Sequence, residues 1–231
     1  MNVQTAIGQP RRVRLKADDF RLLRRSGAFA AYSRSELLDG ELWGTVAEDS
    51  VNPIKLRIED YLRLHEAGAL TEYGKTELID GAVYAMSPQH RRHMVAHSEL
   101  AYRLRRALEA AGSTLFVGVE GSVALSEADL PLPDIVLTDE PRGTGPVPGS
   151  SVRLLVEIAD TSLDHDLLRK ARLFAARGVP EYWIADVNGR VIHQMWSPRD
   201  EDYAERREIA FGERLEAATV EGLAVETEGL D

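Results

Sequence analysis

The sequence predicts a mixed domain of the α/β or α+β class, and three observations favour it. Stretches with helical periodicity alternate along the chain with short apolar stretches typical of strands. One stretch, Val152–Ala159 (VRLLVEIA), is apolar almost throughout, as a strand at the centre of a sheet is. The composition of the 231 residues, 44% hydrophobic and 29% charged, is that of a globular protein.

An internal repeat lies near the N-terminus. Residues 15–44 align without gaps with residues 56–85, each opposite the residue 41 positions later, as Glu36 is opposite Glu77. Ten of the thirty aligned pairs are identical, whereas about two are expected by chance from ordinary residue usage. The identical pairs are Leu15/Leu56, Asp19/Asp60, Leu23/Leu64, Gly27/Gly68, Ala28/Ala69, Tyr32/Tyr73, Glu36/Glu77, Leu37/Leu78, Asp39/Asp80 and Gly40/Gly81.

Each copy predicts a short helix followed by a β-hairpin, so the N-terminal part is a duplicated helix–hairpin unit. In the second copy, Ile58–Ala67 has helical apolar spacing, and the glycine after it typically ends a helix. Asp80-Gly81 then separates two apolar stretches, which indicates a two-residue turn. The first copy has the same Asp-Gly pair, and residues 45–55 are expected to form a linker between the copies.

The rest of the chain predicts helices and strands in a mixed order. A Pro- and Gly-rich stretch before Val152 is expected to be a loop. The expected elements are, in order, a helix over His93–Ala111, strands over 114–119, 122–125 and 134–138, the central strand 152–159, a helix from Ser162 or Asp164 to about Arg177, strands over 182–187 and 191–196 joined at Asn188-Gly189, and a further strand pair near 203–211.

Composition excludes several classes of site. The chain has no cysteine, which rules out disulfides, thiolate metal sites and a cysteine nucleophile. No nucleotide-binding glycine motif, HExxH or GxSxG motif occurs. The formal charge of −10 argues against indiscriminate coating of nucleic acid. No apolar stretch suffices for a membrane span and the N-terminus lacks the features of a signal peptide, so we expect a cytoplasmic protein without membrane contact.

Two acidic residues on apolar strands are the strongest signal of chemistry. Glu157 lies inside the predicted central strand, and Asp134 begins the strand PLPDIVL. A buried carboxylate is costly unless it is paired or bound to a cation. Two such acids at strand ends can together bind a hard divalent ion through their oxygens. The alternatives are a salt bridge, or a carboxylate that points outward at the strand end.

Lys170 lies on the helix after the central strand. Near a metal-bound water its ammonium group could orient a nucleophile or stabilise charge on a phosphate. The alternative is an ordinary ion pair with Asp166, four residues earlier on the helix.

Other polar residues are weaker candidates. Glu77 opens the second hairpin and by itself would be an ordinary surface acid. Arg91, Arg92 and His93 belong to a locally basic stretch that could follow a phosphate backbone. The alternatives are a solvated helix face for the arginines and a structural role for His93.

Taken in order, these pieces resemble the Uma-two family of restriction-endonuclease-like proteins, part of the PD-(D/E)XK nuclease superfamily. The resemblance covers roughly residues 55–225 and rests on ELIDG, on MSP followed by His93, on PLPDIVL, and on the long segment from VEIAD to YWIAD. It implies a restriction-endonuclease-like mixed sheet flanked by helices, with the acids at one end of the sheet. It also implies two regions: residues 1–50, a basic segment with a degenerate copy of the repeat, and residues 51–231, the nuclease-like domain.

The resemblance assigns roles to named residues. Asp134 takes the PD position, Glu157 the acidic position that follows it, and Glu77 the upstream glutamate near the metal. The lysine of the superfamily pattern is replaced by Ala159 here, and the family's displaced lysine corresponds to Lys170, with Asp166 as a supporting acid. Glu36 in the first copy is not expected to be catalytic.

The predicted function is hydrolysis of DNA phosphodiester bonds by an endonuclease that uses Mg²⁺ or Mn²⁺. We expect Asp134, Glu157 and Glu77 to bind the metal, and the protein to form a homodimer. The alternative function is a catalytically inactive nuclease-fold module that binds nucleic acid or protein.

Overall fold

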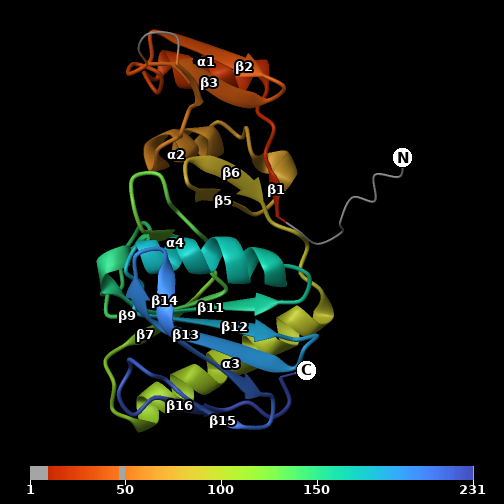
Figure 1. Cartoon of the computed structure of the whole chain (residues 1–231), viewed down its shortest axis with the longest axis vertical. Helices are drawn as coiled ribbons and strands as arrows, with labels where there is room; N and C mark the ends of the chain where they lie inside the picture. Colours follow the sequence, from red (N-terminus) through yellow and green to blue (C-terminus); the bar gives the residue numbers. More distant parts are fainter. Residues whose placement is uncertain (1–9, 47–49, 231) are drawn as a thin grey trace. The chain divides into compact units, whose positions relative to one another are not determined.

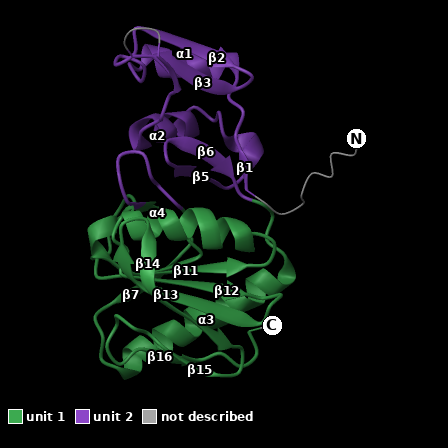
Figure 2. Cartoon of the chain, in the orientation of Figure 1, with its two compact units in different colours: residues 1–9, 87–123, 132–231 green, residues 10–86, 124–131 purple. Residues whose placement is uncertain are grey.

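A computed structural model of the protein describes residues 10–46 and 50–230, which form two compact units (Figures 1 and 2). Residues 87–123 and 132–230 form what we call the sheet unit, and residues 10–86 and 124–131 form the N-terminal unit. The boundary predicted at residue 50 separates the first copy of the repeat from the nuclease-like domain. The two units are defined by packing instead, so this boundary stays a prediction. The described residues do not include residues 1–9, where the sequence predicts no signal peptide, or residues 47–49, in the middle of the predicted linker.

A six-stranded mixed sheet forms the centre of the sheet unit, with strand order β14-β13-β12-β11-β9-β7. Neighbours β11 and β12 are parallel and the other neighbouring strands are antiparallel. The predicted mixed fold class is confirmed. The strands are β7 (Phe116–Val119), β9 (Ile135–Thr138), β11 (Val152–Ala159), β12 (Glu181–Asp186), β13 (Val191–Arg199) and β14 (Asp202–Ala210).

Helices α3 (Arg91–Ala110) and α4 (Ala171–Ala176) lie on opposite faces of this sheet (Figure 1). Leu100 and Leu104 of α3 share a hydrophobic core with Val156 and Ile158 of β11. On the other face, Phe174 of α4 packs edge-on against Tyr182 of β12, with ring centroids 4.8 Å apart. Because successive residues of a strand point to opposite faces, Glu157 points to the α4 face.

The helix predicted to run from Ser162 or Asp164 to about Arg177 is not regular. A π-helical segment, His165–Lys170, precedes α4 and carries the lysine predicted to be functional. π-Helical turns are uncommon and occur frequently at functional sites. Here the wider turn places both Asp166 and Lys170 in the protein interior.

The end of the chain differs from the expected strand pair near 203–211. That stretch is the single strand β14, which pairs with β13, and the last short strands are β15 (Arg214–Glu216) and β16 (Ala224–Glu226). Glu181 is fully buried and accepts hydrogen bonds from the backbone N–H groups of Ala218 (3.0 Å) and Thr219 (2.7 Å). This carboxylate therefore holds the C-terminal segment against the sheet.

Two helix–hairpin segments make up most of the N-terminal unit. The first contains α1 (Ala17–Arg25), β2 (Arg34–Leu38) and β3 (Glu41–Thr45), and the second contains α2 (Ile58–Glu66), β5 (Thr76–Ile79) and β6 (Ala82–Ala85). Both hairpins turn at the expected Asp-Gly pairs, where the aspartates have φ of 53° and 50°. The remaining elements of this unit are β1 (Arg11–Arg12), β4 (Val51–Pro53) and the 3₁₀ turn η1 (Thr71–Tyr73).

Several short strands were not predicted. The expected linker 45–55 contains β4, so the interpretation of that segment as linker alone is wrong. Strand β10 (Val147–Pro148), within the expected loop, pairs with β8 (Val123–Ala124) and is followed by the 3₁₀ turn η2 (Gly149–Ser151). Segments of two or three residues that contain proline show no alternation of apolar and polar positions, which is the signal that predicts strands. Among the described residues, no helix combines the length and apolar character needed to cross a bilayer.

A polar contact joins α2 to β5. His65 Nε2 lies 2.9 Å from both Tyr61 Oη and Thr76 Oγ1, and Tyr61 donates a hydrogen bond to the Thr76 carbonyl at 2.8 Å. Partial burial lowers the pKa of His65 below its ordinary value, because the charged imidazolium is less well solvated there. The neutral ring is therefore the form that suits the fold.

We predict that stability decreases on acidification through this contact. Since the pKa of His65 is lower in the folded state, its stabilising effect is present above the unfolded-state value, about 6.5, and is lost as the pH falls below it. His65→Gln, which cannot be protonated, should flatten the dependence of the urea midpoint on pH between pH 7.5 and 5.5. A variant with the same pH dependence as the unsubstituted protein would contradict this assignment.

Candidate active site

Asp134 and Glu157 are brought side by side by the pairing of β9 with β11. The antiparallel register pairs Ile135 with Val156, so the next positions place Asp134 opposite Glu157. The Ile158 N–H donates a hydrogen bond to Asp134 Oδ2 at 2.8 Å. Both carboxylates are buried, at 4% and 3% exposure. Two acids distant in sequence thus share one sheet end.

Helix α3 and the residues just before it also contact Asp134. His93 Nε2 lies 3.1 Å from Asp134 Oδ2, and His97 Nε2 lies 3.0 Å from the Asp134 carbonyl oxygen. Gln89 donates a longer hydrogen bond to Oδ1, at 3.3 Å. Burial by itself raises the pKa of Asp134, but the hydrogen bond and charge of His93, the Ile158 N–H and the charge of Lys170 outweigh burial and lower it. Asp134 is therefore ionised at neutral pH.

His93 also keeps one nitrogen for another partner. Its Nδ1 is buried, and within residues 10–46 and 50–230 no hydrogen-bond partner reaches it. A buried ring nitrogen without a partner is unusual in folded proteins. His93 could therefore contact a bound group through Nδ1 while Nε2 holds Asp134.

Lys170 is buried against Glu157. Its Nζ donates a hydrogen bond to Glu157 Oε1 at 2.8 Å and lies 4.0 Å from Asp166 Oδ1, and its side chain is 2% exposed. Ser162 donates a 2.6 Å hydrogen bond to Asp166 Oδ2. The two possibilities left open by the sequence, a salt bridge for Glu157 and an ion pair with Asp166, thus both occur, and the contact with Glu157 is the closer one.

The cluster carries more negative than positive charge. Three buried carboxylates, those of Asp134, Glu157 and Asp166, face the single ammonium group of Lys170. Burial raises the pKa of Asp166, Lys170 and Ser162 oppose the rise, and the charge of Asp134 adds to it. Burial likewise raises the pKa of Tyr182 well above its ordinary value, with the charges of Asp166 and Glu157 adding to the effect. Such a site favours a cation.

The residues present fit a hard divalent ion in the chemistry of their donors. Asp134 and Glu157 offer carboxylate oxygens from neighbouring strands, and the Ile158 carbonyl follows on the same strand end. In the part of the chain that the structure describes, no three histidine, aspartate or glutamate side chains come close enough to one another to enclose a metal ion. A complete ligand set therefore needs further oxygen ligands besides these two acids.

Glu77, predicted as the third metal ligand, lies in the N-terminal unit. It occupies the second position of β5 and is fully buried. Its role at the metal stays a prediction. Its counterpart in the first copy, Glu36, is partly exposed and forms an ion pair with Arg34.

The predicted nucleic-acid contacts differ in burial. Arg91 and Arg92 are exposed at the first turn of α3, and Arg92 donates a 3.4 Å hydrogen bond to Asn188 Oδ1. His93 is 7% exposed and faces Asp134. The arginines remain predicted contacts for a phosphate backbone, whereas the observed position of His93 suits it to holding the Asp134 carboxylate.

The sequence did not predict His97, Gln89 or Ser162 as residues of the site. His93 and His97 are four residues apart on one helix, which places both on the same face. That spacing is a signal that could have found His97. Gln89 and Ser162 lie outside regular elements, so no periodicity indicates them.

Comparison with known proteins gives the family of the chain. The model of a family described as "Putative restriction endonuclease", Uma2, matches residues 58–228. The chain belongs to this family. The Uma2 match begins at the second helix of the N-terminal unit and leaves the first helix–hairpin outside. No protein in the curated set matches the chain.

A solved structure has the same fold. It is described as a "putative nuclease belonging to DUF820" from Anabaena variabilis ATCC 29413, and it is similar to this Uma2 protein with a TM-score of 0.51 and 17% sequence identity. The similarity covers 70% of this chain and 89% of the other. The predicted restriction-endonuclease-like fold and the predicted family are both confirmed.

We predict that Lys170 is needed for stability even without substrate. Lys170→Met leaves Glu157 and Asp166 buried without their cation, which should lower the free energy of unfolding by about 3–5 kcal/mol. Arg169→Met, a matched change at an exposed neighbour on the same turn, should alter it by less than about 0.5 kcal/mol. Urea unfolding followed by the fluorescence of the buried Trp183 measures both.

A double variant tests whether the loss of stability in Lys170→Met comes from a buried Glu157 left without its cation. Glu157→Met combined with Lys170→Met removes both charges, and it should be more stable than Lys170→Met alone. If Lys170→Met by itself is as stable as the unsubstituted protein, the buried carboxylates do not depend on this lysine.

Proposed function

We propose that this Uma2 protein is an endonuclease that hydrolyses DNA phosphodiester bonds with a bound divalent metal ion, Mg²⁺ or Mn²⁺. The observation that carries the proposal is the buried pair of Asp134 and Glu157 at one sheet end, with the ammonium group of Lys170 2.8 Å from Glu157. This combination joins oxygen ligands for a hard cation to a positive group beside them. Membership in a family described as "Putative restriction endonuclease" supports the same function.

Asp134 and Glu157 would hold the metal, together with the Ile158 carbonyl and with Glu77, directly or through water. When bound, the ion would supply a water of lowered pKa and neutralise charge on the scissile phosphate. His93 would keep Asp134 ionised and fixed in orientation, because it contacts the same oxygen that the Ile158 N–H contacts. Ordered, ionised ligands reduce the cost of assembling the site.

Lys170 would position the attacking water or stabilise charge that develops on the phosphate. Its own position is set by Glu157 and by Asp166, which Ser162 holds in turn. Arg91 and Arg92, exposed on α3, would contact the phosphate backbone. The negative charge of the whole chain makes such local basic contacts necessary for DNA binding.

We predict that Asp134→Asn and Glu157→Gln each lower metal-dependent cleavage of plasmid DNA by about 10²–10⁴-fold, with an unchanged circular dichroism spectrum. Glu77→Gln should lower cleavage as well. Glu36→Gln is the matched control in the first copy of the repeat, and it should cleave like the unsubstituted protein.

Calorimetric titration with Mg²⁺ and Mn²⁺ distinguishes the two candidate functions. A binding heat that disappears in Glu157→Gln supports the nuclease. Absence of both metal binding and cleavage, across double-stranded and single-stranded DNA and RNA, would establish the inactive nuclease-fold module instead. Cleavage that persists in the Asp134→Asn/Glu157→Gln double variant would show that these acids are not the active site.

We further propose a homodimer, because an enzyme that cuts both strands of a duplex commonly pairs two active sites. Light scattering at micromolar concentration should give twice the mass of the 25.6 kDa chain. A monomer mass throughout that range would contradict the dimer without affecting the metal site.

A further inference from the structure

The two helix–hairpin segments of the N-terminal unit match in local detail as well as in element order. Helices α1 and α2 both have nine residues, and in both the third residue is an aspartate that accepts a hydrogen bond from the backbone of the residue before the helix. These bonds join Lys16 N–H to Asp19 Oδ2 at 2.7 Å and Arg57 N–H to Asp60 Oδ2 at 3.2 Å. The four residues occupy equivalent positions in the aligned repeat.

The strand that precedes each helix pairs with the hairpin of the other copy, an arrangement that we call crossed. Strand β1 comes before α1, yet it pairs with β6 of the second copy, with Arg12 opposite Tyr84. Strand β4 comes before α2, yet it pairs with β3 of the first copy, with Pro53 opposite Trp43. If the alignment is extended upstream at the same offset of 41 residues, Arg12 is opposite Pro53, and Trp43 is opposite Tyr84 within the repeat. The two pairings are therefore the same contact made in both directions.

Backbone hydrogen bonds continue both crossed pairings by one residue. Val13 N–H donates to the Val83 carbonyl at 2.8 Å, and Ile54 N–H donates to the Leu42 carbonyl at 2.9 Å. Val13 and Ile54 are also equivalent positions, exposed by 4% and 3%. Each copy thus gives its leading strand to the hairpin of the other copy.

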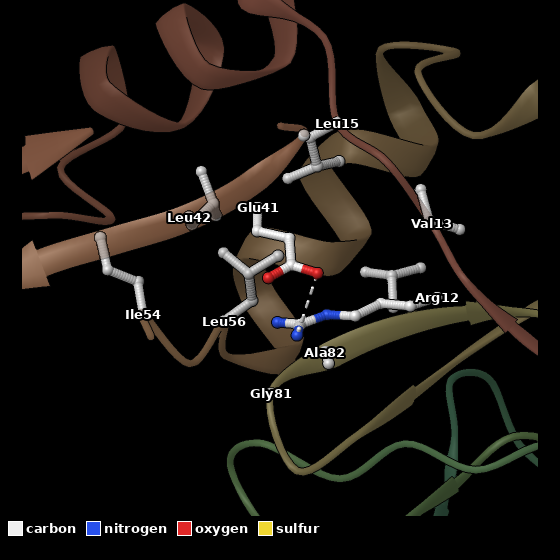
Figure 3. A pocket seen from close by; sticks show the side chains of 11 residues that line it. Arg12, Val13, Leu15, Glu41, Leu42, Ile54, Leu56, Gly81 and Ala82 are labelled. Atoms are coloured by element: carbon white, nitrogen blue, oxygen red, sulfur yellow. Dashed lines mark ion pairs between the residues drawn. The ribbon is translucent and has the colours of Figure 1, made fainter. Parts of the chain in front are cut away.

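Figure 3 shows a small hollow of about 20 Å³ in the N-terminal unit. It is lined by Arg12, by residues that follow the two leading strands, and by the turns and second strands of both hairpins. Its apolar walls consist of three pairs of equivalent residues, which are Val13 and Ile54, Leu15 and Leu56, and Leu42 and Val83. The ion pair of Arg12 with Glu41, 3.6 Å apart, belongs to one side only, because the repeat places Pro53 and Ala82 at the equivalent positions.

At the edge of this hollow, the turn of each hairpin lies close to the segment that follows its own leading strand. A Cβ atom on Gly40 would lie 2.8 Å from Arg14 Cβ, and one on Gly81 would lie 2.4 Å from Lys55 Cβ. Both glycines also have positive φ, of 76° and 72°. Glycine is therefore required at both turns so that the chain can pass its own hairpin closely after its leading strand has paired with the other.

We infer that the two copies form one module by exchange of these strands, and that the first copy serves to position Glu77. Strands β1, β6 and β5 form one sheet, and its registers place Arg12, Tyr84 and Glu77 in one row across it. Without β1, strand β6 would be an open edge beside the strand that carries Glu77. This inference rests on the proposed role of Glu77 at the metal.

A shared core supports the same conclusion. Leu23 of α1 and Leu64 of α2, equivalent in the repeat and both fully buried, belong to one hydrophobic cluster. The first copy contributes this packing and a strand, but its counterpart of the buried Glu77, Glu36, is partly exposed. Its role is therefore to support the second copy.

Two matched proline substitutions in the full chain test the exchange. Val13→Pro removes the N–H that bonds to β6, and Ile54→Pro removes the equivalent N–H that bonds to β3. In hydrogen–deuterium exchange, Val13→Pro should increase amide exchange in residues 76–85, and Ile54→Pro should increase it in residues 34–45. The opposite assignment, in which Val13→Pro loosens only residues 34–45, would overturn the crossed arrangement.

Engineered cysteines test the crossing even if the proline variants do not fold, because the chain has no cysteine of its own. Arg12→Cys with Tyr84→Cys should form an intramolecular disulfide under mild oxidation, since register places these residues opposite each other. Arg12→Cys with Trp43→Cys, the pairing of an uncrossed arrangement, should not. A disulfide only in the second pair would refute the exchange.

Cleavage assays test the positioning role separately. Val13→Pro should lower metal-dependent cleavage by about a hundredfold through displacement of Glu77, whereas Ile54→Pro should retain most of the activity. Exchange and crosslinking do not depend on activity, so they test the module even if the protein proves not to be a nuclease. If the unsubstituted protein cleaves DNA and Val13→Pro cleaves equally well despite the increased exchange in residues 76–85, the positioning role is wrong.

Discussion

The contact between Lys170 and Glu157 is the interaction on which the candidate site depends. Two carboxylates on adjacent strands, Asp134 and Glu157, are buried on one sheet end, where each would be destabilised by loss of water and by the other's charge. The buried ammonium group compensates one of them directly at 2.8 Å. Asp134 is instead stabilised by a backbone N–H and by His93. The structure thereby keeps two acids in the interior with oxygen ligands for a cation.

The surrounding fold can be understood as support for this arrangement. The β9–β11 register brings the acids together, α3 supplies two histidines four residues apart, and the π-helical turn before α4 directs Lys170 inward. Each support comes from a different element, so the site exists only when the sheet unit is folded. Stability and the candidate site are therefore linked, because the buried Lys170 contacts both Glu157 and Asp166.

The two aligned helix–hairpin segments of the N-terminal unit differ in what they contain. One copy carries the buried Glu77 and lies within the Uma2 match, and the other lies outside it. Crossed strands join the two copies through equivalent backbone bonds from Val13 and Ile54. The first copy then has a structural task, because its strand β1 completes the sheet next to the strand that carries Glu77.

The sequence by itself determined the mixed fold class, the long helix α3, the central strand β11 and both Asp-Gly turns, because these follow from local periodicity and turn chemistry. It also indicated Asp134 and Glu157, since acids within apolar strands are unusual, and Lys170, from its place after the central strand and from the family resemblance. Only the tertiary structure decided that Lys170 contacts Glu157 more closely than Asp166, that His97 supports Asp134, and that β1 and β4 cross between the copies. These facts depend on register and on contacts between distant segments, and no local pattern encodes the partner of a two-residue strand or the direction of a buried side chain.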